Sequence, residues 1–123
     1  MNRISKNDYV DFIAACINLI EKNLNILTIE KNEISTTYKC HSEVIGNLNI
    51  NIEDFSIVGS VYSIFIQFDN PENILELVGE SYYKTNIFHK NKMNIMGFAE
   101  QKDFVYNRFY DIVDAIVNHE VIE

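Results

Sequence analysis

The hydrophobic pattern is clearest in the stretch Ser56–Asp69, where positions alternate with a period of two. The even positions form an unbroken apolar row: Tyr62, Ile64, Ile66 and Phe68. The odd positions are mixed, but none is charged: Val61, Ser63, Phe65 and Gln67. A period of two is typical of a strand, and the absence of charge predicts that elements cover both of its faces at least in part. We therefore expect a central strand here.

Three strands are predicted before this one, and each turn between them must keep apolar residues on one face. The expected inward-facing residues are Leu27 and Ile29; Ile34, Thr36, Tyr38 and Cys40; Val44, Leu48, Ile50 and Ile52; and Val58 with the even positions of the last strand. A two-residue turn at Lys31-Asn32 pairs Ile29 with Ile34. The first strand, Asn25–Glu30, is the weakest of the four, and a frayed helix end is its alternative.

The turn into the third strand has two candidate positions. A Gly46-Asn47 turn has the right local residues, but it would place charged Glu43 on the core face, so it is rejected. A three-residue loop at His41-Ser42-Glu43 pairs Cys40 with Val44 and Tyr38 with Gly46, which keeps the core face apolar. A further odd-length loop is expected around residues 54–56.

Helical patterns surround the four strands. Ser5, with Asp8 three residues later, predicts the start of an amphipathic helix of about five turns that ends near Asn23. Asn70-Pro71 starts a second helix that runs to about Tyr83. A third runs from about Ala99 to His119, and its expected core residues are Val105, Phe109, Ile112 and Ile116, widened by Tyr106, Val113 and Val117. Residues 86–98 form a small hairpin or an ordered loop.

The expected fold class is α+β: an N-terminal helix, an antiparallel meander of about four strands with one additional short hairpin, and two further helices packed on the sheet. The chain has 123 residues, 47% of them hydrophobic, and no stretch rich in proline or glycine. This composition predicts a single globular domain over residues 1–123.

Charge and motifs exclude several functions. The net charge is −8 with 18 acidic and 10 basic residues, so we expect no nucleic-acid or membrane-surface binding. No catalytic or phosphate-binding motif is present, and no catalytic residue, metal ligand or cofactor is assigned. Cys16 and Cys40 lack metal-site spacing and are expected to be buried, as in a protein of the reducing cytoplasm. Cys40 and its neighbour His41 should point to opposite faces.

Two rows of acidic residues stand out. Glu72, Glu76 and Glu80 are four residues apart on the expected second helix, with Tyr83 at the margin of the row. On the last helix Glu100, Asp103, Asp111 and Asp114 lie, with Asn107 and Asn118, within an arc of roughly 80° at 100° per residue. Such rows are typical of solvent-exposed helix faces in an acidic protein. The sharper interpretation is a docking surface for a basic protein partner.

In its small size, acidity and lack of catalytic motifs, the chain resembles the small immunity proteins that bacteria carry beside secreted or contact-delivered toxins. The acidic rows at residues 72–80 and 100–114 carry this resemblance. It implies a cytoplasmic, non-enzymatic protein that takes part in contact-dependent growth inhibition between bacteria. Such a protein would be a stoichiometric inhibitor that binds and blocks a basic toxin domain, such as a nuclease.

An alternative function belongs to a different class. An N-terminal helix that crosses a curved sheet can enclose a pocket, which would make the chain a small-ligand-binding or enzymatic α+β domain. The polar groups expected in such a pocket are Tyr38, Tyr62, Ser63 and Gln67.

Overall fold

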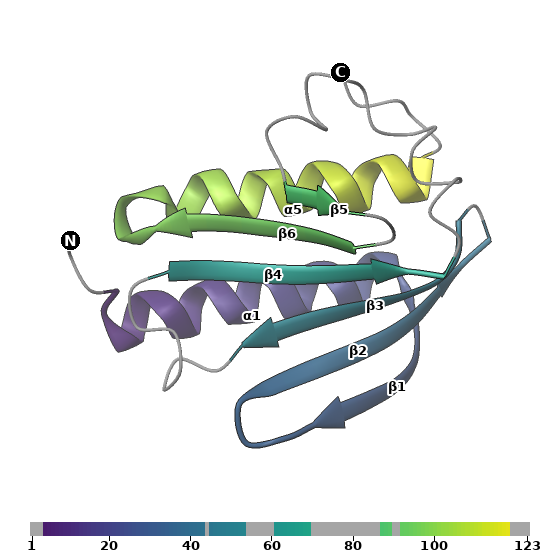
Figure 1. The fold of residues 1–123 in the computed structure, drawn as a ribbon, viewed down its shortest axis with the longest axis horizontal. Coiled ribbons are helices and arrows are strands. Elements are labelled where there is room, and N and C mark those ends of the chain that lie inside the picture. The colour runs from purple at the N-terminus through teal and green to yellow at the C-terminus, as the bar shows by residue number, and fades with distance from the viewer. Residues whose placement is uncertain (1–3, 44, 54–60, 70–86, 90–91, 119–123) are drawn as a thin grey trace.

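The computed structural model describes residues 4–43, 45–53, 61–69, 87–89 and 92–118. These residues form two layers, a six-stranded sheet and two long helices packed on one of its faces (Figure 1). The strand order is β1-β2-β3-β4-β6-β5, and all neighbouring strands are antiparallel. An N-terminal helix, an antiparallel sheet and a C-terminal helix confirm the α+β class.

Helix α1, Lys6–Asn23, begins where the sequence predicts. Ser5 caps it, because its Oγ accepts a hydrogen bond from the backbone nitrogen of Asp8 at 3.1 Å. At the other end the backbone nitrogen of Leu24 donates to the carbonyl of Ile20 at 2.9 Å, and the chain turns directly into the sheet. The buried residues of the helix are Tyr9, Phe12, Cys16, Leu19 and Ile20.

The strands are β1 (Asn25–Lys31), β2 (Ser35–Ser42), β3 (Gly46–Glu53), β4 (Val61–Phe68), β5 (Ile87–His89) and β6 (Lys92–Phe98). The four-strand meander is confirmed, and its first segment is a strand rather than a helix end. The hairpin expected at residues 86–98 is also present. Its longer strand, β6, pairs with β4, and β5 forms the edge of the sheet.

Strand β4 is central, between β3 and β6, and its even-numbered residues Tyr62, Ile64, Ile66 and Phe68 are all buried against the helices. The other face is covered in part, as predicted: Ser63 is buried and Val61 is half-buried, whereas Phe65 and Gln67 are exposed. Within the described residues the helices cover one face only (Figure 1). The expected second helix, up to Tyr83, and the corner at residues 54–56 lie outside the described residues.

The β2–β3 register differs from the predicted one. Cys40 pairs with Leu48 rather than Val44, and Tyr38 pairs with Ile50 rather than Gly46. The loop does have three residues, but they lie between Ser42 and Gly46. This shift of four residues keeps every side chain on its predicted face, so the apolar pattern alone does not select between the two registers.

Polar contacts in the turn and across the two strands favour the observed register. Ser42 Oγ accepts a hydrogen bond from the backbone nitrogen of Ile45 at 3.4 Å, and the Ile45 side chain is fully buried. Gly46 has a φ of +80°, a conformation that other residues rarely adopt. Across the strands, Asn51 Nδ2 donates to Ser35 Oγ at 2.9 Å and to Thr37 Oγ1 at 2.8 Å.

The β1–β2 turn also differs from the predicted one. Ile29 pairs with Tyr38 instead of Ile34, and the turn comprises the four residues between Lys31 and Thr36. Asn32 sets this turn, because its Oδ1 accepts hydrogen bonds from the backbone nitrogens of Ile34 and Ser35, both at 2.8 Å. A register shift between residues 26 and 28 marks a β-bulge in β1.

Among the apolar residues of β1 and its turn, Ile26 is half-buried and packs against the core, but the others do not. Leu27 and Ile29 are each 55% exposed, and Ile34 is 50% exposed, although all three were predicted to face inward. Ile29 lies opposite buried Tyr38, which places both residues on the helix-covered face. Leu27 is exposed because it is the extra residue of the β-bulge, where Ile26 takes the inward position. Ile29 is exposed because the helices do not extend far enough over the edge strand.

A short 3₁₀ turn, η1 (Ala99–Gln101), leads into helix α5, Lys102–Asn118. The residues that α5 buries are Val105, Phe109, Ile112, Val113, Ala115 and Ile116. Val117, predicted to widen the core face, is exposed. The β6 backbone approaches this region closely at Gly97, where an added Cβ would lie 2.5 Å from Val105 Cγ2. Only glycine fits there, which explains its place in a strand.

Candidate functional site

The first candidate site is the solvent face of α5. The helix packs through one apolar stripe, so the opposite side is turned to solvent. Asp103 and Asp111 on this side are exposed, Asp114 is half-buried, and Glu100 is exposed in η1 just before the helix. These four predicted residues therefore lie on or directly before one helix face. The other predicted partner-binding residues, Glu72, Glu76, Glu80 and Tyr83, lie outside the described residues.

The acids of α5 have few partners within the described residues. The ion pair found there is between Lys39 Nζ and Glu30 Oε1, at 3.0 Å on the opposite edge of the sheet. Asp114 Oδ1 accepts a hydrogen bond from Asn118 Nδ2 at 2.7 Å, which is a contact within the same helix. The face thus carries negative charge that nothing in the described part of the chain neutralises by direct pairing.

Exposed apolar side chains flank this row of acids. Tyr110 is 47% exposed and Phe104 is 43% exposed, and at 100° per residue they lie on opposite sides of Asp103 and Asp114. Tyr110 stacks on Tyr106, with ring centroids 6.5 Å apart. The Arg108 guanidinium carbon lies 4.9 Å from the centroid of the Phe104 ring. Phe104 was not predicted as part of this site. The sequence does indicate it, because it is a large apolar residue that lies outside the repeat of the core stripe.

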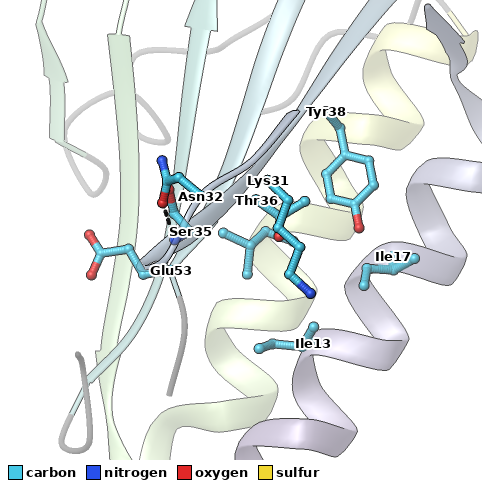
Figure 2. A pocket seen from close by; sticks show the side chains of 9 residues that line it. Ile13, Ile17, Lys31, Asn32, Ser35, Thr36, Tyr38 and Glu53 are labelled. Atoms are coloured by element: carbon cyan, nitrogen blue, oxygen red, sulfur yellow. Dashed lines mark hydrogen bonds between the residues drawn. The ribbon is translucent and has the colours of Figure 1, made fainter. Parts of the chain in front are cut away.

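A second candidate site is a pocket of about 250 Å³ between α1 and the β1–β2 hairpin (Figure 2). Ile13 and Ile17 line it from α1, and Tyr38 and Ile52 line it from the sheet. Its polar lining residues are Lys31, Asn32, Ser35, Thr36 and Glu53. The alternative function placed a pocket between the N-terminal helix and the sheet, and one exists there at the edge of the sheet.

One of the four polar groups expected in such a pocket lines it. Tyr38 does, whereas Tyr62 is buried in the core and stacks on Tyr9 with ring centroids 5.7 Å apart. Ser63 and Gln67 belong to the opposite face of the sheet from buried Tyr62 and Ile66, since neighbouring residues in a strand alternate. There Ser63 Oγ bonds to Asn94 Oδ1 at 3.0 Å, and Gln67 is exposed.

The Tyr38 side chain is buried, with 5% of its surface exposed, yet its hydroxyl has no hydrogen-bond partner among the described residues. No polar side-chain atom of these residues is both unpartnered and sealed from solvent, so the hydroxyl opens into the pocket. Burial, and secondarily the negative charge of Glu21, raises the pKa of Tyr38 above its ordinary value. At neutral pH this hydroxyl is therefore a neutral donor.

The cysteines do not form a reactive site. Both are free and buried, as predicted, and His41 beside Cys40 is exposed on the other face. Burial raises the pKa of Cys16 to about 12 and that of Cys40 to about 11, so neither forms a thiolate near pH 7. In the part of the chain that the structure describes, no group of three His, Cys, Asp or Glu residues could hold a metal ion.

Comparisons with protein-family models, with curated proteins and with solved structures found no match to this chain. Among the described helices, none combines the length and the hydropathy needed to cross a membrane. Function is therefore inferred from the residues of this chain alone.

Proposed function

We propose that this protein is a non-enzymatic binding module that inhibits a basic toxin domain by stoichiometric binding, as bacterial immunity proteins do. The observation that carries the proposal is the solvent face of α5, where acids without ion pairs in the described residues lie between exposed Tyr110 and Phe104. We place the protein in the cytoplasm, where it would bind a delivered toxin such as a nuclease.

The composition of this face supports the proposal. Tyrosine and other aromatic residues provide much of the binding energy in protein interfaces, because they bury a large area at a low cost in conformational entropy. Unpaired acids around them attract a basic partner over long range and accelerate association. An acidic row alone is typical of any solubilising surface; the flanking aromatic side chains favour a docking surface.

The proposal is tested in two steps. The tagged chain is first purified from its native host, and the proteins that accompany it are identified. A captured basic protein should arrest growth when expressed alone and should do so no longer when this chain is co-expressed. Recovery of no growth-arresting partner would contradict the inhibitor function.

The surface is tested separately with the purified partner. Asp103→Lys combined with Asp111→Lys should weaken binding at least tenfold, because both changes remove attraction and add repulsion. Asp11→Lys combined with Glu21→Lys makes the same charge change on exposed positions of α1 and should alter binding less than twofold. Equal effects of the two pairs would show that only net charge matters and that α5 is not the docking face.

A further inference from the structure

We infer that the pocket between α1 and the β1–β2 hairpin binds a small carboxylic acid with an apolar body, about ten non-hydrogen atoms in all. The pocket and the acidic face of α5 share no residues. The inference therefore stands apart from the proposed toxin-binding function, and each can fail without the other.

The walls of the pocket determine the apolar part of the ligand. Ile13 and Ile17 face it from α1, and Ile52 faces it from the inner side of β3. These three branched side chains offer no hydrogen-bonding group, so the group that contacts them must be a hydrocarbon, ring or chain. Ile13 and Ile17 are only half-buried, so a ligand seated here would remove apolar surface from water.

The polar groups determine the other end of the ligand. Figure 2 shows the Tyr38 hydroxyl pointing toward Ile17 and the Lys31 side chain extending from the hairpin toward Ile13. The hydroxyl and the ammonium group therefore both point toward α1, which forms one side of the pocket. A neutral phenol and an ammonium can each donate a hydrogen bond to an anionic acceptor, and such charge-assisted bonds are stronger than neutral ones.

The charges around the pocket are mixed. Glu53 lines it and the negative charge of Glu21 reaches the Tyr38 hydroxyl, so the attraction for an anion comes from Lys31. Lys31 forms no ion pair within the described residues, and neighbouring Glu30 is paired with Lys39 at 3.0 Å. The Glu53 carboxylate points away from the side where Lys31 and Tyr38 meet the helix (Figure 2). The cation at the opening is therefore available to a ligand.

The size of the pocket limits the ligand. A protein cavity of about 150 Å³ holds one benzene ring, so about 250 Å³ holds roughly ten non-hydrogen atoms. A short arylalkanoic acid has this size. Tyr9 fixes α1 to the sheet beside the pocket through a hydrogen bond from its hydroxyl to the carbonyl of Glu53 at 2.7 Å.

The test uses three probes of matched shape: 3-phenylpropanoate, 3-phenylpropanamide and 3-phenylpropylamine. Each is titrated into the full chain while the backbone amide signals are followed by NMR. The acid should give saturable shifts at Ile13, Ile17 and Tyr38, with a Kd in the low millimolar range or tighter. The amide and the amine should bind at least fivefold more weakly.

Variants test whether Lys31 and Tyr38 are the groups that bind the carboxylate. Lys31→Met keeps the stem and removes the charge, so it should weaken binding of the acid at least fivefold and leave the amide within twofold. Tyr38→Phe should weaken the acid about threefold. Lys22→Met removes an exposed lysine that does not line the pocket and should change nothing.

Several outcomes would overturn the inference. These are no saturable shift of the pocket residues up to about 20 mM acid, equal or tighter binding of the amide or the amine, and an unchanged affinity for the acid in Lys31→Met. Since Lys31 is exposed, this variant is expected to fold, and its amide spectrum confirms the fold before titration.

Discussion

Two neighbouring rows of α1 contact the sheet in very different ways. The first row includes Tyr9 and Phe12, whose rings meet Tyr62 of β4 at centroid distances of 5.7 and 4.7 Å and are fully buried. The second row is Ile13 and Ile17, which face the β1–β2 hairpin across an open pocket and are only half-buried. The same helix therefore has a packed side and a loosely packed side.

This difference follows from the position of the strands in the sheet. Two helices cover a limited width, and here they centre on β4 and its neighbours, where they bury every inward side chain of that strand. The edge strand β1 lies beyond them, so its Ile29 remains exposed. Stability is thus concentrated at the centre of the sheet, and the space that a ligand could enter lies at its edge.

The largest effect is expected from truncating the packed row. Phe12→Ala should lower the free energy of unfolding by about 3–5 kcal/mol, because it leaves a cavity between α1 and β4. Ile17→Ala in the loosely packed row should cost about 1 kcal/mol, since water already reaches that side chain. Urea denaturation of both variants measures the contrast, and similar losses would show that the two rows are packed alike.

Alkaline pH should destabilise the protein through the buried thiols. Burial raises the pKa of Cys16 to about 12 from an ordinary 9.0, so above pH 9 its thiol ionises in the unfolded chain before it does in the folded one. The resulting stabilisation is complete below pH 9 and is lost as the pH rises toward 12. The expected slope is about 1.4 kcal/mol per pH unit for each such thiol.

This pH dependence is measured by urea denaturation between about pH 8 and pH 10.5. Cys16→Ala provides the control, because it removes one buried thiol and keeps the tyrosines and lysines that also titrate at alkaline pH. The variant should show a shallower decline than the wild type. An identical decline would mean that the Cys16 thiol does not contribute.

The two rows also differ in the hydrogen bonding of the tyrosine hydroxyl found at each. Tyr9 belongs to the packed row, and Tyr38 lines the pocket opposite the loosely packed row. Tyr9→Phe should cost about 1–2 kcal/mol, because it removes the hydrogen bond to the Glu53 carbonyl. Tyr38→Phe should change the free energy of unfolding by less than about 0.5 kcal/mol, since its hydroxyl has no partner among the described residues. Thermal or urea unfolding distinguishes them, and a larger loss for Tyr38→Phe would reverse the comparison.

The smallest effect is expected at the edge. Leu27→Thr combined with Ile29→Thr should leave stability within about 0.5 kcal/mol, because both side chains are more than half exposed and threonine favours a strand. Ile50→Thr, a fully buried position on β3, is the matched control and should cost several times more. A large loss in the double variant would indicate that β1 is covered in solution.

Much of the fold follows from the sequence because burial has a period. The inner face of β4 and the core stripe of α5, apart from Val117, were predicted from this period and are confirmed. The Ser5 cap was predicted from its spacing to Asp8 and is also confirmed. The registers of β1 and β3 on β2 were not. The register of β3 differs from the prediction by four residues, and that of β1 differs by four residues after the bulge and by three before it. An even shift leaves each residue on its face, so burial alone does not detect it; the side-chain bonds of Asn32 and Asn51 do.

The candidate sites were predictable to different degrees. The row from Asp103 to Asp114 needs only helical spacing, so the sequence locates it directly. The pocket depends on where β1 ends relative to α1. The Asn32 turn is local, but the Tyr9 anchor joins two residues 44 positions apart, which local patterns do not reveal. Tyr38 was expected among the polar groups of such a pocket. Lys31 was instead assigned to a turn.

The β-bulge in β1 has a consequence for solubility. An edge strand offers unpaired backbone groups to any other strand, and exposed apolar side chains make such intermolecular pairing more favourable. The irregularity between Ile26 and Thr28 interrupts the regular spacing of those groups, and the ion pair of Glu30 with Lys39 adds charge just beyond it. A second strand could align with only a few residues of this edge. The bulge thereby protects the exposed Leu27 and Ile29 from seeding fibrils.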